Sequence, residues 1–264
     1  GASNTAVGIS SLENNTTASS NTAVGYRSLY CNTTGYSSVA VGNCALATNT
    51  TGHSNVTVGV NSMKLNTTGI RNIAIGKDAF EANTTGSDNV AIGFTALDNN
   101  TTGVDNVAVG NNAGDANTTG FGNVAIGHNA LLVNTAGEVN VSIGCRSMNA
   151  NTSGNCNTFV GKDAGLSNTV GFRNSGFGIK AGENVTTGDQ NVFLGFESGA
   201  QGGMVNITTE DNRLVAGHSN ITNSYVKVDW TVTSDLRDKT NFGTVPHGLD
   251  FVNQLQPVSF QFRT

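Results

Sequence analysis

Five carboxylates recur at one position of the sequence and are its first candidates for chemistry. Each stands five residues after a glycine, and they are Glu13, Glu81, Asp98, Asp115 and Glu183. If equivalent positions stack in space, Glu81, Asp98 and Asp115 form a column of oxygen ligands suited to a hard cation. Asp88 and Asp105 form a second acidic pair. The competing interpretation, which we favour, is a solvated turn that holds no ion.

The cysteines and histidines do not form a comparable cluster in the sequence. Cys31, Cys44, Cys145 and Cys156 show no CxxC or Cys/His spacing, so they are predicted to be free thiols in a reducing compartment. The histidines occupy unrelated positions, at His53, His128, His218 and His247. We therefore expect neither a metal nor a cofactor.

Aromatic side chains stand at positions that look exposed. Three follow the same glycine (Tyr26, Phe94 and Phe196), and three lie in a turn (Tyr36, Phe121 and Phe172). Such rings could stack on sugars, and packing between subunits explains them equally well. N-x-T/S triplets begin at Asn32, Asn49 and Asn66, but these asparagines belong to a repeated turn, which argues against glycosylation.

A repeat carries all these residues. The glycine that closes each V-A-I-G segment returns every 17 residues, at Gly8, Gly25, Gly42, Gly59, Gly76, Gly93, Gly110, Gly127, Gly144, Gly161, Gly178 and Gly195. The interval never changes. A repeat of fixed length indicates that each copy is one rung of a stack, whose ends meet the rungs above and below.

The rung is predicted to be built from short strands. In segments such as Asn89–Gly93, "NVAIG", branched residues alternate with alanine, which is the two-residue period of a strand. The "NTTG" segment supplies a turn. We predict an all-β, parallel β-roll or β-solenoid, each rung being strand, turn, short second segment and turn. We expect Val and Ile to fill the inside of the coil.

The small residues suggest how such a thin rod is stabilised. Alanine in the middle of "VAIG", and Ala or Ser three residues after the glycine, would form stripes that another backbone can approach closely. We infer that chains pack side by side, and three chains are favoured by analogy with other fibrous β-proteins.

Composition excludes several partners. The net charge is −5 with no basic cluster, so the chain lacks the footprint of a protein that binds nucleic acid or anionic lipid. No apolar run approaches the roughly 18 residues of a membrane span. The N-terminal "GASNTAVG" lacks the features of a signal peptide and begins in mid-repeat, so we expect an upstream part.

The repeat ends near Gly199, and the following residues have a different pattern. We predict a repeat shaft over 1–201, a β connector over 202–233, and the N-terminal part of a further, truncated domain over 234–264. Strands are expected in the connector over 204–208, 213–216 and 225–232, where apolar and polar residues alternate.

Two stretches resemble known families. The "NVAIGxxAL" rungs are similar to the β-roll heads of trimeric autotransporter adhesins and to shaft repeats of phage tail fibres. "TVTSDLRDKTNF" followed by "GLDFVNQLQPVSFQF" resembles the start of the C-terminal intramolecular chaperone of phage endosialidases, tail spikes and fibres. On spacing alone, Ser234 and Lys239 would be ordinary loop residues.

The second resemblance implies chemistry. The family's chaperone trimerises, drives folding of the fibre and cuts itself off with a serine and a lysine. These residues correspond to Ser234 and Lys239, with Asp235 and Arg237 as motif residues and the cut between Ser234 and Asp235. The family's chaperone continues well beyond Thr264.

The resemblances imply a homotrimeric virion tail fibre that attaches to a host-cell receptor, which could be a glycan, without inserting into a membrane. An adhesive fibre on a bacterial cell surface, for prey or host recognition, is the alternative. The third hypothesis is a glycan-cleaving tail spike. We expect no substrate-directed enzyme activity beyond self-cleavage.

Overall fold

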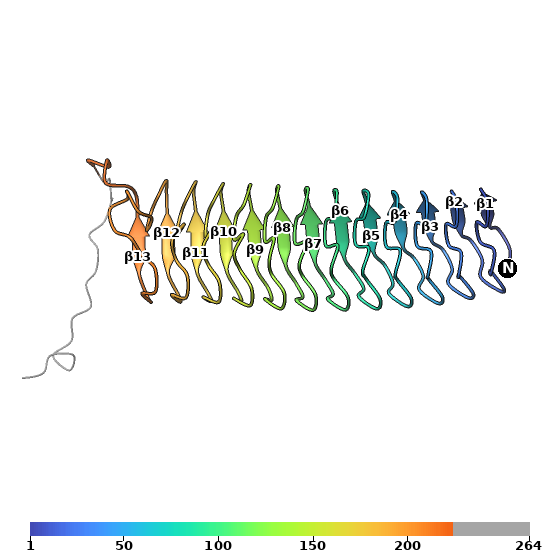
Figure 1. The fold of residues 1–264 in the computed structure, drawn as a ribbon. Helices are drawn as coiled ribbons and strands as arrows, with labels where there is room; N and C mark the ends of the chain where they lie inside the picture. Colours follow the sequence, from blue (N-terminus) through green and yellow to red (C-terminus); the bar gives the residue numbers. More distant parts are fainter. Residues whose placement is uncertain (224–264) are drawn as a thin grey trace, which may run out of the picture. The chain divides into compact units, whose positions relative to one another are not determined.

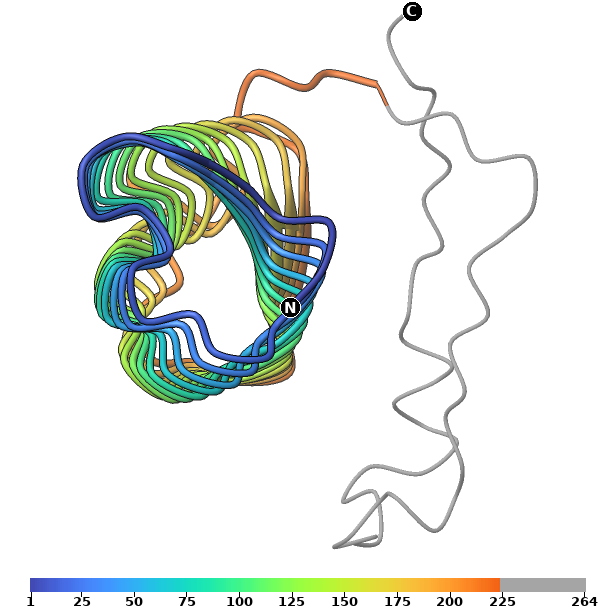
Figure 2. The same cartoon turned by 90° about the vertical axis from the view of Figure 1, so that its right-hand side faces the viewer.

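The computed structural model describes residues 1–223, and over them the chain is a β-solenoid with one strand in each rung. All thirteen strands pair in parallel, in sequence order, within one sheet (Figure 1). Seen along the stack, the rungs superimpose as nested coils (Figure 2). The strands are β1 (Thr5–Val7), β2 (Thr22–Val24), β3 (Val39–Val41), β4 (Val56–Val58), β5 (Ile73–Ile75), β6 (Val90–Ile92), β7 (Val107–Val109), β8 (Val124–Ile126), β9 (Val141–Ile143), β10 (Thr158–Val160), β11 (Ser175–Phe177), β12 (Val192–Leu194) and β13 (Leu214–Ala216).

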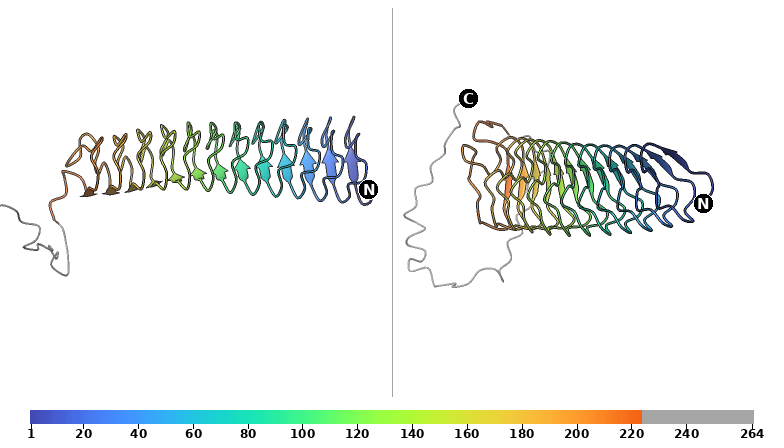
Figure 3. Two further views of the ribbon diagram at one scale, coloured as in Figure 1. Left: turned by 90° about the horizontal axis from the view of Figure 1, so that it is seen from below. Right: turned by 45° about the vertical axis from the view of Figure 1, so that its right-hand side comes forward.

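The pairing register confirms the 17-residue rung. Val90 of β6 lies opposite Val107 of β7, and 107 − 90 is 17. Val192 of β12 lies opposite Leu214 of β13, and 214 − 192 is 22, so the last rung contains five additional residues. The side views show the evenly spaced rungs (Figure 3). No helix that could cross a membrane occurs in the part of the chain that the structure describes.

Several predicted local elements differ from the structure. Each rung has one strand and not two, because the second segment consists of turns. The strand expected over 204–208 is absent, since those residues form the bends of the enlarged last rung. The strand expected over 213–216 is present as β13, where it continues the solenoid sheet. The strand expected over 225–232 lies outside the described residues.

The orientation predicted for the strand side chains is wrong. Alanines at the strand centre, such as Ala23, Ala40 and Ala74, have no exposed surface, whereas the flanking Val56 and Val58 are 37% and 39% exposed. The interior of a 17-residue coil is narrow, so it accommodates a methyl group at the strand and receives its larger side chains from elsewhere. The small-residue stripes therefore lie inside the coil and cannot meet a second chain.

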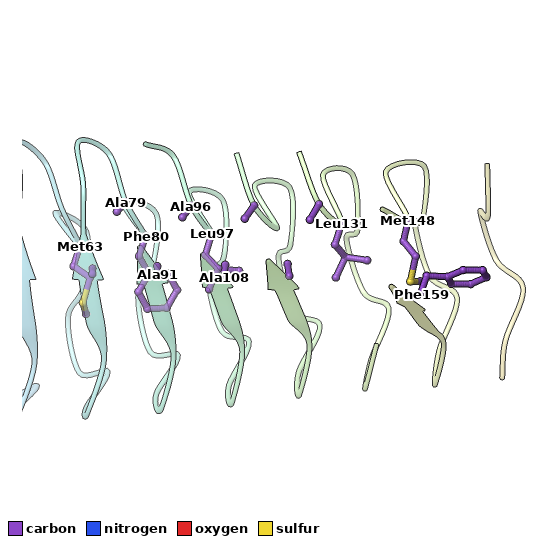
Figure 4. Packing of buried hydrophobic residues seen from close by; sticks show 14 of the residues in the cluster. Met63, Ala79, Phe80, Ala91, Ala96, Leu97, Ala108, Leu131, Met148 and Phe159 are labelled. Atoms are coloured by element: carbon purple, nitrogen blue, oxygen red, sulfur yellow. The ribbon is translucent and has the colours of Figure 1, made fainter. Parts of the chain in front are cut away.

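The larger core residues come from the position four after the repeat glycine, which we call the leucine column. Its apolar members turn inward and pack against the strand alanines (Figure 4). They are Leu12, Leu29, Leu46, Met63, Phe80, Leu97, Leu131 and Met148. In these rungs the core is therefore a stack of one large and two small side chains, whereas the rung of β7 has Gly114 in place of the large one.

The core pattern changes near the C-terminal end of the stack. Phe159 and Phe193 replace the strand alanine and are fully buried, with ring centroids 6.4 Å apart. The leucine column holds Gly165, Gly182 and Gly199 there, and a Cβ atom at any of them would overlap one of the two rings. The bulk has moved from one column to the other within the same interior volume.

Three residues of nearly every rung adopt the left-handed backbone conformation. In one rung they are Asp88, Thr95 and Leu97, with φ of 62°, 49° and 52°. This conformation costs non-glycine residues roughly 1–2 kcal/mol each. The repeat glycine has a different reason for its identity: at Gly93, a Cβ atom would collide with the carbonyl group of Gly110 in the next rung.

Two ladders of buried asparagine join the rungs. In the strand ladder, the Asn106 backbone N–H donates to Asn89 Oδ1 at 2.9 Å and the Asn106 side chain donates to the Gly120 carbonyl at 2.9 Å. In the turn ladder, Asn83 Nδ2 donates to Asn66 Oδ1 at 2.8 Å. These amides satisfy buried backbone groups that the three-residue strands leave unpaired.

Candidate functional site

The outer face of the sheet is the most extended surface feature of the solenoid. It consists of the first and third residues of each strand, which point away from the core, and we call it the outer sheet face. No residue of these two columns in β1–β13 is charged, and most are Val or Ile. Ile73 and Ile75 of β5 are each 38% exposed. An uncharged apolar stripe of this kind is a candidate interaction surface.

The acidic column does not assemble a cation site. Glu81 is engaged by Lys64, with 3.2 Å between Nζ and Oε1, and Glu183 lies 3.4 Å from Lys180. Asn99 donates to Asp115 at 3.0 Å. No group of three His, Cys, Asp or Glu residues in a metal-binding arrangement occurs among residues 1–223. The second acidic pair, Asp88 and Asp105, forms no cation site either, because the Asp88 carboxylate accepts two hydrogen bonds from Arg71, each 2.6 Å long.

Asp98 carries the largest electrostatic cost of this column. Burial, together with the negative charges of Asp115, Glu81 and Asp78, raises its pKa to about 6. Burial also raises the pKa of Asp115. Stacking like charges between rungs therefore favours the protonated carboxyl.

We expect Asp98→Asn to stabilise the fold at pH 7–8 and to have little effect near pH 3.5. The pKa of Asp98 is higher in the folded than in the unfolded chain. The protonated carboxyl therefore costs the fold nothing at low pH, and the cost of ionising it appears as the pH rises from about 4 to about 6. Asparagine avoids that cost. Because the group is half-buried, we expect a gain of about 1 kcal/mol at neutral pH. Urea titrations at both pH values measure it; an equal gain at pH 3.5 would contradict the electrostatic cause.

The other predicted positions remain dispersed. All four cysteines are free, as predicted; Cys31 and Cys44 are half-buried, and Cys145 and Cys156 are exposed. The described histidines do not cluster. His53 stacks on Tyr36, with 4.4 Å between the ring centroids, and His218 Nε2 lies 3.2 Å from a Glu197 carboxylate oxygen. His247 lies outside the described residues.

The aromatic residues are exposed, and the glycosylation triplets are not. Tyr26, Tyr36, Phe94, Phe121, Phe172 and Phe196 each expose more than a third of their surface. Asn32, Asn49 and Asn66 have none, because they form the turn ladder. Folded rungs therefore cannot present these amides to a modifying enzyme, whereas the rings are available to a partner.

The residues assigned to self-cleavage, Ser234, Asp235, Arg237 and Lys239, lie outside the described residues. Sequence reasoning missed the outer sheet face, because alternation shows that a strand has two different faces without showing which one is inside. The leucine column could have indicated which face is inside, because its large apolar residues have to be buried and leave room for only small side chains from the strand.

Comparison with protein families gives one match. The family described as chaperone of endosialidase matches residues 234–264, which confirms the resemblance at that segment and begins at Ser234. No curated protein matches the chain. The β-solenoid followed by the start of such a chaperone is the combination that the two resemblances predict for a phage-type fibre.

Proposed function

We propose that the chain is part of a homotrimeric tail fibre that attaches a virion to its host cell. The outer sheet face carries this proposal: an uncharged Val and Ile stripe along every rung needs a partner of matching length, and a second copy of the same chain has one. Three copies turned toward a common axis would bury all three stripes in a closed assembly. The chaperone match supports the number three by analogy.

The remaining surface suits attachment. Exposed rings recur outside the strands, at Tyr26, Tyr36, Phe94, Phe121, Phe172 and Phe196. Aromatic side chains are common anchors for receptors and sugars. We propose a receptor on the host-cell surface, with a glycan as the candidate class, as the second partner.

An adhesive fibre on a bacterial cell surface is the alternative. The same solenoid and chaperone would serve it, and localising the full-length product to purified virions or to a cell envelope separates the two. A glycan-cleaving tail spike is a third hypothesis, and release of reducing ends from a host polysaccharide by the purified fibre would establish it.

Charges placed on the outer sheet face are expected to abolish trimer formation. Ile75→Glu with Ile92→Glu would bury six carboxylates at the trimer axis. Thr68→Glu with Thr85→Glu places the same charges on exposed turns. Sedimentation of the full-length product should give a trimer for the wild type and the turn variant only. A wild-type monomer, or a trimeric Ile variant, would rule out this interface.

Self-cleavage between Ser234 and Asp235 is the catalytic part of the proposal. A serine hydroxyl becomes a useful nucleophile when a base removes its proton, and a desolvated Lys239 is the proposed base. We expect Ser234→Ala and Lys239→Ala to leave the full-length chain intact while the wild type is cut. Chain masses decide the matter: an uncut wild type, or a variant still cut after Ser234, would show that the dyad is wrong.

A further inference from the structure

A cavity of about 310 Å³ opens on the side of the solenoid, across three consecutive rungs. We call it the side notch. It is lined by Glu138, Val139, Asn155, Val170, Phe172 and Arg173, and by Cys156, which lies beside Asn155 in the middle rung. We propose that the side notch binds a carboxylated sugar residue of a surface polysaccharide. The proposal rests on the attachment function and specifies the ligand class and its site.

Arg173 forms the end of the side notch that would bind the ligand carboxylate. Its guanidinium lies over the Phe172 ring, 5.3 Å from the centroid. Arg71 occupies the same rung position earlier in the chain and is neutralised by two hydrogen bonds to Asp88. No ion pair joins Arg173 to a carboxylate within residues 1–223, because the next rung has Gln190 at that position. Its forked donors match a ligand carboxylate.

Glu138 and Asn155 form the opposite end of the side notch, which would bind the hydroxyl groups of the sugar. The Glu138 backbone N–H donates to Asn155 Oδ1 at 2.7 Å, which leaves the Asn155 amide N–H groups available as donors. The Glu138 carboxylate only accepts. Glu138 and Phe172 are two rungs apart, about 10 Å along the stack. A second carboxylate at this end would be repelled by Glu138, so the notch selects a ligand with one acidic and one hydroxylated end.

An apolar wall joins the two ends. Phe172 is 37% exposed, and Val139 and Val170 lie beside it as exposed aliphatic side chains. The C–H face of a pyranose ring packs on such a surface while its hydroxyls remain directed to polar groups. This combination favours a sugar acid over a simple organic anion.

Val139 adds backbone strain to the wall of the notch. Its φ is 55°, a conformation unfavourable for a β-branched side chain. Thr95 is the other β-branched residue in this conformation among residues 1–223, and its hydroxyl is hydrogen-bonded to the Phe94 carbonyl. Val139 has no such compensation and is 51% exposed. The equivalent residue of every described rung has positive φ, so the rung fold imposes this conformation, and glycine would adopt it at lower cost.

The test measures binding of uronic-acid oligosaccharides to the full-length fibre. Galacturonate, glucuronate and mannuronate oligomers are compared with their methyl esters, which keep the sugar and lose the charge. We expect at least one acid oligomer to bind and its ester not to bind. Arg173→Gln should weaken binding by about 10- to 100-fold, and Phe172→Ala should weaken it as well. The matched controls, Arg71→Gln and Phe121→Ala, change the same rung positions outside the notch and should bind as the wild type does.

Thiol labelling locates the bound sugar independently of affinity. Cys145 and Cys156 are both exposed, and only Cys156 lines the notch. Bound oligosaccharide should slow alkylation of Cys156 and leave Cys145 unchanged. Val139→Gly should fold more stably yet bind more weakly, which separates loss of binding from loss of structure.

Two results would overturn the proposal. One is that no uronic-acid oligomer binds, and the other is that binding occurs without protection of Cys156 or sensitivity to Arg173→Gln. Adsorption of the fibre to host cells, measured in parallel, distinguishes this failure from failure of the attachment function. A fibre that adsorbs normally with Arg173→Gln retains its function and excludes the notch as the receptor site.

Discussion

Replacing Phe159 with alanine should destabilise the solenoid by about 3–5 kcal/mol, the usual cost of removing a fully buried aromatic ring. Phe159 has no exposed surface and stacks on Phe193, which lies two rungs further along the solenoid interior. Its neighbours in the leucine column and on the next strand, Gly165 and Gly176, have no side chain to fill the space. Urea denaturation monitored by far-UV circular dichroism measures the loss.

A double variant tests whether the two columns exchange volume. Gly165→Leu alone should also be strongly destabilising, because its side chain would overlap the Phe159 ring. Phe159→Ala with Gly165→Leu restores the arrangement of Ala125 and Leu131 two rungs earlier. The double variant should therefore be more stable than either single variant. Additive losses in this cycle would contradict the exchange.

Replacing Asn134 with leucine should destabilise the solenoid by at least about 3 kcal/mol, since several buried polar groups lose their partners together. Asn134 Nδ2 donates to Asn117 Oδ1 at 2.9 Å and to the Gly137 carbonyl at 3.0 Å, and Asn134 Oδ1 accepts from Asn151 Nδ2 at 2.8 Å. Thermal unfolding of the variant, compared with wild type, reports the effect.

The chain offers a matched control and a natural example for this prediction. Asn111→Leu changes an exposed asparagine and should have little effect on the unfolding midpoint. The turn ladder ends at Asn168, because the next rung has Val185 at the equivalent position. Asn168 Oδ1 is accordingly the one buried side-chain polar atom without a hydrogen-bond partner in the described residues. Equal midpoints for the Asn134 and Asn111 variants would show that the ladder does not stabilise the stack.

The period of the solenoid could be predicted from the sequence, whereas its inside and outside could not. Seventeen-residue spacing without insertions permits only in-register stacking, and the parallel pairing of Val90 with Val107 follows from it. Alanine and valine are both apolar, so alternation alone does not decide which of them faces a narrow interior. That choice depends on the volume that Leu97 and its equivalents already occupy.

The left-handed residues were beyond sequence reasoning for a different reason. Leu29, Met63 and Phe80 have φ of 50°, 49° and 57°, although such side chains avoid this region in isolation. Their conformation is imposed by burial in the core and by a backbone hydrogen bond to the following rung. Leu29, for example, donates its N–H to the Ala45 carbonyl at 3.1 Å in the following rung. Local propensity does not contain that information.

The direction of the rung-to-rung hydrogen bonds determines how the solenoid would respond to mechanical force. Bonds such as that from the Val90 N–H to the Asn106 carbonyl, 2.8 Å long, run between rungs and therefore along the stack. Tension applied along the stack would load the rungs in series, so they would open one at a time from an end. Each opened rung would extend from about 4.8 Å to roughly 55–60 Å of chain. Single-molecule stretching would record this as a staircase of equal steps, the behaviour of a tether that dissipates a sudden pull.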